Sequence, residues 1–159
     1  MTNHVKGARD FDFLFGSWSV RSRRLKERMR GSQEWEEHSA KCEVEPILGG
    51  YGNVDRFEMQ FHGESWHGTT LRFFNPANGL WNIYWVDNRR FVLDPPMVGK
   101  FENGVGTFFG DDVFEERPIR VRFIWSQPGK DEARWEQAFS ADGEKTWETN
   151  WIMEFTRPR

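Results

Sequence analysis

Apolar and polar residues alternate with a period of two along most of the chain. This period is typical of β-strands that bury one face, because successive side chains of a strand point to opposite sides of its sheet. Clusters of Gly, Pro, Asn and Asp divide the pattern into runs. The expected strands are 17–29, 33–48, 51–61, 66–75, 80–88, 97–102, 105–114, 118–127, 132–140 and 146–156. The pattern predicts an all-β protein of about ten strands.

The connections between these runs are short, and they predict antiparallel neighbours. Asn103-Gly104 separates two alternating runs, and this dipeptide favours a type I′ hairpin turn because both central residues need positive φ. Segments 74–79 and 126–132 are longer turns of Pro, Asn and Gly. None of these connections has room for a crossover helix, which excludes a parallel sheet. Sequential antiparallel strands favour a closed up-and-down barrel, with a β-sandwich as the open alternative.

Strand parity predicts which side chains point into this barrel. On the last strand, Trp147, Thr149, Trp151, Met153, Phe155 and Arg157 share a face. The other expected inward sets are Trp18, Val20, Ser22 and Arg24; His38, Ala40, Cys42 and Val44; Trp81, Ile83 and Trp85; Ile119, Val121, Phe123 and Trp125; and Trp135, Gln137 and Phe139. Most of these side chains are aromatic or aliphatic, so the interior is expected to be apolar.

The start of the first strand carries a recognisable motif. Gly16-x-Trp18 follows one short helical turn and resembles the calycin barrels, which are the lipocalins, fatty-acid-binding proteins and nitrobindin-type proteins. In those families the Trp crosses the closed base of the barrel and packs against a basic residue from the last strand. The resemblance implies that Gly16, Trp18 and Arg157 close the base here.

A wider resemblance covers most of the chain. The segments "DFLFGSW", "LGGYGNVD", "YWVD", "GKFENGVGTFFGDD" and "WEQAFSADGEKTWETNW" are similar to an uncharacterised bacterial family of calycin-like domains. The resemblance implies the same barrel over a single domain, residues 1–159. It brings no established activity with it.

Composition narrows the classes of partner. Nine Trp and fifteen Phe among 159 residues indicate a core built largely from rings. A net charge of −3 removes the general electrostatic reason to bind nucleic acid. The chain has no signal-peptide pattern and no apolar run as long as a membrane span, so we expect a cytoplasmic protein without a membrane partner. A homodimer stays open.

These observations favour a binding protein. An apolar cavity with a few convergent polar groups is what a small-molecule site usually resembles. We therefore expect a small apolar or aromatic molecule in the interior and no cofactor. The expected ligand-binding residues are Arg24, His38, Trp85, Arg90, Trp125, Trp135, Gln137, Thr149 and Trp151.

Two alternatives remain open. In one, the protein is a lyase, isomerase or hydrolase in which His38 acts as acid or base while Arg24 or Arg90 holds an anionic substrate. In the other, rings fill the barrel and the protein is a structural or interaction module. No catalytic residue is assigned, because no nucleophile and base stand at a suitable spacing.

Metal and haem sites are not expected. His62, Glu64 and His67 lie close in sequence, but strand alternation puts His67 on the opposite face from the other two, and Cys42 is the only cysteine. Nitrobindin-type barrels hold haem through a histidine late in the chain, whereas the last histidine here is His67.

The segment "SADGEKTW" resembles the Asp-box hairpin of sialidases, with Glu144 at the position usually held by Gly. Asp boxes repeat in each blade of a propeller, and this chain has one copy. We therefore expect a structural turn, in which the Asp142 side chain accepts hydrogen bonds from backbone N–H groups.

Overall fold

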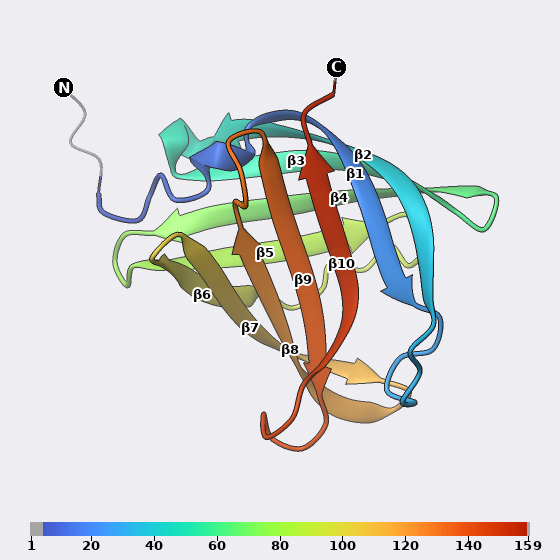
Figure 1. Ribbon diagram of the computed structural model, residues 1–159. Coiled ribbons are helices and arrows are strands. Elements are labelled where there is room, and N and C mark those ends of the chain that lie inside the picture. The colour runs from blue at the N-terminus through green and yellow to red at the C-terminus, as the bar shows by residue number, and fades with distance from the viewer. Residues whose placement is uncertain (1–4, 159) are drawn as a thin grey trace.

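The computed structural model describes residues 5–158 and is a closed barrel of ten antiparallel strands (Figure 1). The all-β up-and-down barrel predicted from the sequence is therefore confirmed, and the sandwich is wrong. The strands are β1 (Gly16–Leu25), β2 (Trp35–Ile47), β3 (Gly52–Phe61), β4 (Glu64–Asn75), β5 (Leu80–Asp87), β6 (Met97–Glu102), β7 (Val105–Phe114), β8 (Arg117–Ser126), β9 (Glu132–Ser140) and β10 (Glu148–Thr156). Two short 3-10 turns, η1 (Asp12–Leu14) and η2 (Leu48–Gly50), accompany them.

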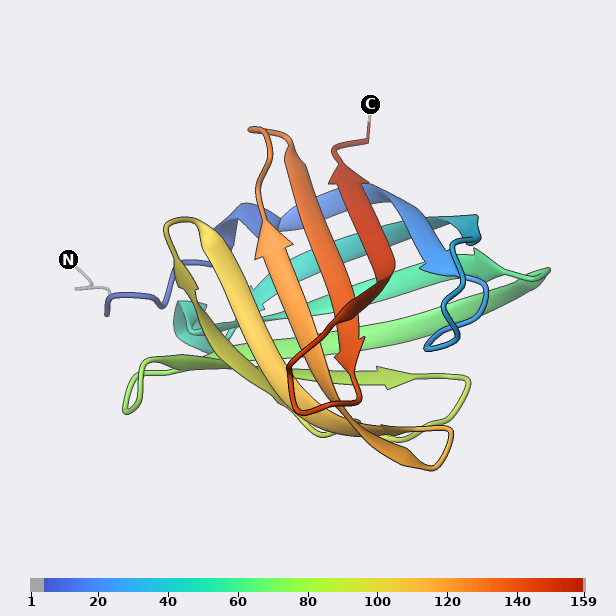
Figure 2. The same cartoon turned by 60° about the horizontal axis from the view of Figure 1, so that its bottom comes forward.

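Each strand pairs with its neighbours in the sequence, and β1 closes the ring by pairing with β10. The connections are hairpins, which Figure 2 shows projecting at both ends of the barrel. Asn103 and Gly104 have φ of 52° and 80°, as a type I′ turn requires. The short β6–β7 hairpin predicted from this dipeptide is present.

The part of the core at the end of the barrel covered by η1 is aromatic. Phe11, Trp18, Trp81 and Phe108 are fully buried. The Phe11 ring meets Trp81 edge-on with centroids 4.9 Å apart, and the Phe101 ring likewise at 4.8 Å. Such T-shaped pairs are a favoured geometry for aromatic rings, so this end of the barrel is packed solid.

Trp18 lies at the centre of this closed end. Its indole Nε1 donates a hydrogen bond to the Leu14 carbonyl at 2.8 Å, and the Arg157 guanidinium covers its ring. Arg157 also donates to the carbonyls of Ser17 and Phe13, which ties the end of the chain to η1 and β1. Gly16 has φ of 103°, and a Cβ there would lie 3.0 Å from Arg157 Nη1. A residue without a side chain therefore fits this position.

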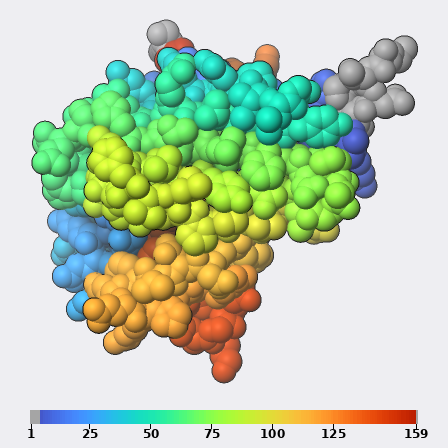
Figure 3. All heavy atoms as spheres, turned by 180° about the vertical axis from the view of Figure 1, so that it is seen from behind, coloured from blue at the N-terminus to red at the C-terminus, as the bar shows by residue number. Residues whose placement is uncertain are grey.

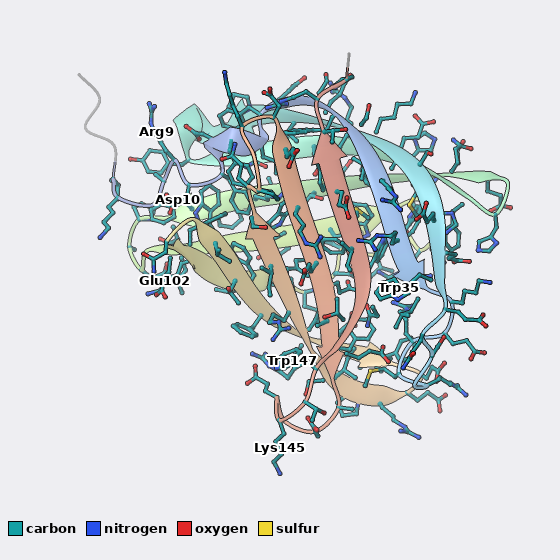
Figure 4. The ribbon with its side chains drawn as sticks, in the orientation of Figure 1. Arg9, Asp10, Trp35, Glu102, Lys145 and Trp147 are labelled. Carbon is teal, nitrogen blue, oxygen red and sulfur yellow. The ribbon has the colours of Figure 1, made fainter. Side chains whose placement is uncertain are left out.

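The predicted parity of β10 fails at its beginning. The β9–β10 register shifts between Thr149 and Trp151, so Asn150 is a bulged residue and is completely buried. Thr149 loses the inward position expected for it. Trp147 precedes the strand and packs on the outer surface, 6.0 Å from Phe109 and with Arg122 over its ring (Figure 4). One extra residue in a strand moves every side chain beyond it to the other face, which explains both errors.

Candidate functional site: a cavity in the barrel

The half of the barrel away from Trp18 holds a cavity of about 370 Å³. It lies between the inner faces of the strands and reaches the loops at their far ends, among which are the β5–β6 loop and the end of β7. Figure 3 shows the surface hollowed where the yellow segment around residue 90 faces the orange segment around residue 115. Side chains therefore do not fill the interior. The alternative of a structural or interaction module required a filled barrel. The volume lies within the range of roughly 300–1,000 Å³ common for small-molecule sites.

Indole rings form much of the wall. Trp135 and Trp151 meet edge-on with centroids 5.5 Å apart, and Trp66 stacks on Trp151 at 5.4 Å. Trp151 is fixed by a hydrogen bond of 2.8 Å from its Nε1 to the Ser22 hydroxyl. The remaining apolar wall residues include Phe57, Ile83, Trp85, Val121, Phe123, Trp125, Phe139 and Met153. The wall thus offers flat apolar surface to a ligand.

Three arginines gather at the open end of this wall. Arg24 lies with its guanidinium carbon 5.0 Å from the centroid of Trp151, and Arg89 lies 4.4 Å from that of Trp66. Arg28 lies 4.9 Å from the Phe114 ring. Within residues 5–158, none of the three forms an ion pair with a carboxylate. They rest on aromatic rings instead.

Burial and mutual repulsion act on these cations. Loss of solvation, together with the charges of Arg28 and Arg89, lowers the pKa of Arg24 to about 10. Burial and the charge of Arg89 also lower the pKa of Arg28, against the opposing charges of Glu148, Asp112 and Glu115. A lowered pKa of a cation means that its charged form is disfavoured where it lies. An anion at this mouth would relieve that cost.

Asp87, at the end of β5, holds the loop that carries two arginines. Its Oδ1 accepts hydrogen bonds from the backbone N–H groups of Arg89 and Arg90, and its Oδ2 accepts one from Trp85 Nε1 at 2.9 Å. Burial alone would raise the pKa of Asp87, but these bonds lower it, so the carboxylate is ionised. Arg90 forms an ion pair with Asp94 at 2.7 Å, whereas the Arg89 guanidinium lies over the Trp66 ring.

A second polar group lies deeper, between the cavity and the closed end. Arg72 and Asp55 form an ion pair of 2.9 Å in which both side chains are 3% exposed. Arg72 also donates to Asn53 Oδ1 at 2.8 Å, and Asp55 accepts from the Thr70 backbone N–H at 2.8 Å. Both partners of the pair line the cavity. They give its inner end a polar surface whose charges compensate each other.

A comparison of folds gives a match to a solved structure, that of the S-type phycobiliprotein lyase CPES from Guillardia theta. The TM-score is 0.63 at 12% identity, over 94% of this chain and 90% of that one. The fold is a calycin-like barrel. No family model matches the chain, and no curated protein matches it. At this identity the match concerns the fold alone.

Most of the residues predicted for the site surround this calycin-like cavity. The structure brings together Arg24, Trp85, Arg90, Trp125, Trp135, Gln137 and Trp151. Gln137 is the most buried of the polar ones and donates a hydrogen bond of 2.9 Å to Asn150 Oδ1. Their role in binding stays a prediction.

Thr149 and His38 do not line the cavity. Thr149 is displaced by the bulge that places Asn150 inside. His38 has the expected inward parity, but it lies where β2 extends past its pairing with β3, next to the Phe61 ring at 4.7 Å between centroids. Its Nε2 lies 3.3 Å from Glu36 Oε1. His38 therefore belongs to a separate group at the barrel edge.

Several polar residues of the wall are not among the ligand-binding residues predicted from the sequence, namely Arg28, Asp55, Thr70, Arg72 and Arg89. Parity contained part of the signal. Asp55 shares a face with Phe57 and Met59, and Arg72 shares one with Trp66 and Phe74. Opposite charges on apolar faces of neighbouring strands predict a buried ion pair. Arg28 lies in the loop after β1, although the expected strand 17–29 included it with the same parity as Arg24. Arg89 lies in the β5–β6 loop, outside any expected strand, where parity carries no signal.

Within residues 5–158, no helix has the length and apolar character of a membrane span.

Proposed function

We propose that the barrel binds a small apolar or aromatic molecule that carries an anionic group. The anion lies among Arg24, Arg28 and Arg89, and the apolar body lies against the indoles of the wall. The observation that supports this most is that three arginines lie at the mouth of an aromatic cavity and form no ion pair with a carboxylate in the part of the chain that the structure describes. Membership of the bacterial calycin-like family resembled by the sequence motifs is part of the same proposal.

The energetics favour such a ligand. Arg24 and Arg28 are partly desolvated, so an anion beside them interacts more strongly than it would in water. Guanidinium groups match carboxylates and sulfonates with paired N–H donors. The aromatic wall adds the burial of apolar area, which drives association of the ligand body. A neutral apolar ligand gains only the second contribution.

The enzymatic alternative has less support. It assigned His38 as acid or base, but His38 is absent from the cavity wall and its Nε2 faces Glu36. A general base must lie within hydrogen-bond reach of the proton it removes, either directly or through one water. Binding alone accounts for the geometry of the cavity.

The experiment compares two fluorescent probes of similar shape. Anilinonaphthalene sulfonate is anionic, and N-phenylnaphthylamine is its neutral counterpart. We expect the wild type to bind both probes. Arg24→Met should weaken the affinity for the anionic probe about tenfold or more and leave the affinity for the neutral probe nearly unchanged. The matched control is Arg21→Met, because Arg21 lies on the same strand but pairs with Glu37 on the outer surface.

Two results would overturn the proposal. One is an equal loss of both probes in Arg24→Met with near-ultraviolet circular dichroism unchanged. The other is an equal loss of the anionic probe in Arg21→Met. The same variants can be tested by displacing the probes with a long-chain carboxylate and with its methyl ester. This repeats the comparison of an anionic and a neutral ligand with a different apolar body.

A further inference from the structure

Glu36, His38 and His62 place three metal-ligating groups together outside the cavity. Their donor atoms all lie within 4.8 Å of one another. We propose that these three residues form a binding site for a divalent transition-metal ion of the Zn²⁺ type. This site is independent of the ligand proposed for the barrel interior.

The two distances from Glu36 to the histidines match the needs of a metal. Glu36 Oε1 lies 3.3 Å from His38 Nε2 and 3.3 Å from His62 Nε2. Ligands about 2.1 Å from a metal in tetrahedral directions lie roughly 3.4 Å from one another. An ion can therefore bind with small movements of the three side chains. The same carboxylate oxygen faces both imidazole nitrogens.

The fold brings the three side chains together by two routes. Glu36 and His38 are two residues apart on β2, so they share one face of the strand. His62 begins the turn between β3 and β4, with φ of 51° followed by 80° at Gly63. This hairpin projects beyond the barrel at the right of Figure 1 and brings His62 to Glu36. His62 and His38 lie with ring centroids 5.6 Å apart.

The polar atoms here are incompletely satisfied. His38 Nε2 is buried and makes no hydrogen bond of acceptable geometry with the described residues, although Glu36 Oε1 is near it. A buried imidazole nitrogen without a partner is costly, and a bound ion would remove that cost.

The donor set selects the class of metal. Two imidazole nitrogens and one carboxylate oxygen suit Zn²⁺ and neighbouring first-row ions, whereas Ca²⁺ and Mg²⁺ prefer oxygen ligands alone. His62 is 61% exposed in its side chain, while His38 is only 10% exposed. One side of the site therefore faces solvent, where water or an external ligand completes the coordination.

Phe61 separates this group from the cavity. Its ring packs on His38 at 4.7 Å and on Trp66 at 5.6 Å, and neither Phe61 nor His38 belongs to the cavity wall. Loss of metal binding would leave the indoles and arginines of the cavity in place. The two proposals are therefore tested by different variants.

The test uses the full chain without an affinity tag, treated with a chelator and then titrated with Zn²⁺ in a calorimeter. Co²⁺ serves as the spectroscopic probe, since its visible absorption reports the coordination geometry. We expect one Zn²⁺ per chain, and a rise in Tm with Zn²⁺. His62→Ala should weaken the affinity for Zn²⁺ at least about tenfold. It should not unfold the protein, because the His62 side chain is exposed.

The matched control is His67→Ala, because His67 is also an exposed histidine and lies on the neighbouring strand. It should bind Zn²⁺ as the wild type does. Glu36→Gln should also weaken Zn²⁺ while keeping the side-chain size. The proposal fails if the wild type binds no Zn²⁺, if His62→Ala binds it as tightly as the wild type, or if His67→Ala loses it equally.

Discussion

The guanidinium carbon of Arg157 lies 3.5 Å from the centroid of the Trp18 ring, and this contact joins the end of the last strand to the start of the first. The two residues come from opposite ends of the chain and meet where β1 and β10 close the barrel. A cation over an indole face is attracted by the negative charge of the π-system. The contact therefore stabilises the closed form of the barrel.

Replacing this cation should weaken the closed end. We expect Arg157→Met to lower the free energy of unfolding by about 1–2 kcal/mol, since it removes the cation over the indole and two hydrogen bonds to carbonyls. Arg157→Lys should recover part of this, because it keeps the charge but loses the planar fork. Urea denaturation measures both. Lys130→Met, at an exposed position in the β8–β9 turn, is the control, and an equal loss there would contradict the role given to Arg157.

The ten strands could be predicted because each follows the period of two and ends at a turn with recognisable residues. The same period explains why six of the seven expected wall residues meet, among them Trp135 and Trp151, whereas Arg90 lies in the β5–β6 loop. It could not predict the bulge at Asn150, since nothing in the local pattern marks one inserted residue. Nor could it bring His62 to Glu36, because that contact depends on the path of a hairpin. Alternation specifies faces within strands, whereas loops and bulges are set by tertiary structure.

The buried pair of Arg72 and Asp55 gives a second prediction, about the cost of an unpaired charge. Either Arg72→Met or Asp55→Leu should lower the free energy of unfolding by about 3–5 kcal/mol, because each leaves the other charge buried alone. The double variant should be less destabilised than the sum of the two, and near the level of one single variant. A double-mutant cycle in urea measures the coupling. Additive losses would show that the pair is not coupled.

Gly68 gives a third prediction, because it lies against one of the cavity indoles. A Cβ at this position would lie 1.9 Å from Trp85 Cη2, so Gly68→Ala must displace the ring. We expect a loss of about 1–3 kcal/mol and a change in tryptophan emission. Combining Gly68→Ala with Trp85→Leu should restore part of the stability. Gly129→Ala is the control, because its Cβ would meet only the flexible Glu132 carboxylate at 3.2 Å.

The turn between β9 and β10 gives a prediction about pH. Asp142 accepts hydrogen bonds from the Thr146 hydroxyl, from the backbone N–H groups of Thr146 and Lys145, and from Ser140 Oγ. These bonds, with Thr146 contributing most, lower the pKa of Asp142 from 3.8 to about 2. The sequence predicted a turn in which Asp142 accepts hydrogen bonds from backbone N–H groups, and the structure contains these bonds.

The sign of the pH effect follows from this lowered pKa. The folded state favours ionised Asp142, so its stabilising contribution is complete above pH 3.8 and is lost as the pH falls toward about 2. Asp142→Asn keeps one acceptor oxygen but cannot ionise. We expect its Tm to lie below that of the wild type at pH 7, with the difference constant down to about pH 5 and shrinking between about pH 4 and pH 2. Thermal scans of both proteins across this range measure the difference. A difference in Tm that stays constant down to pH 2 would mean that ionisation of Asp142 does not stabilise the turn.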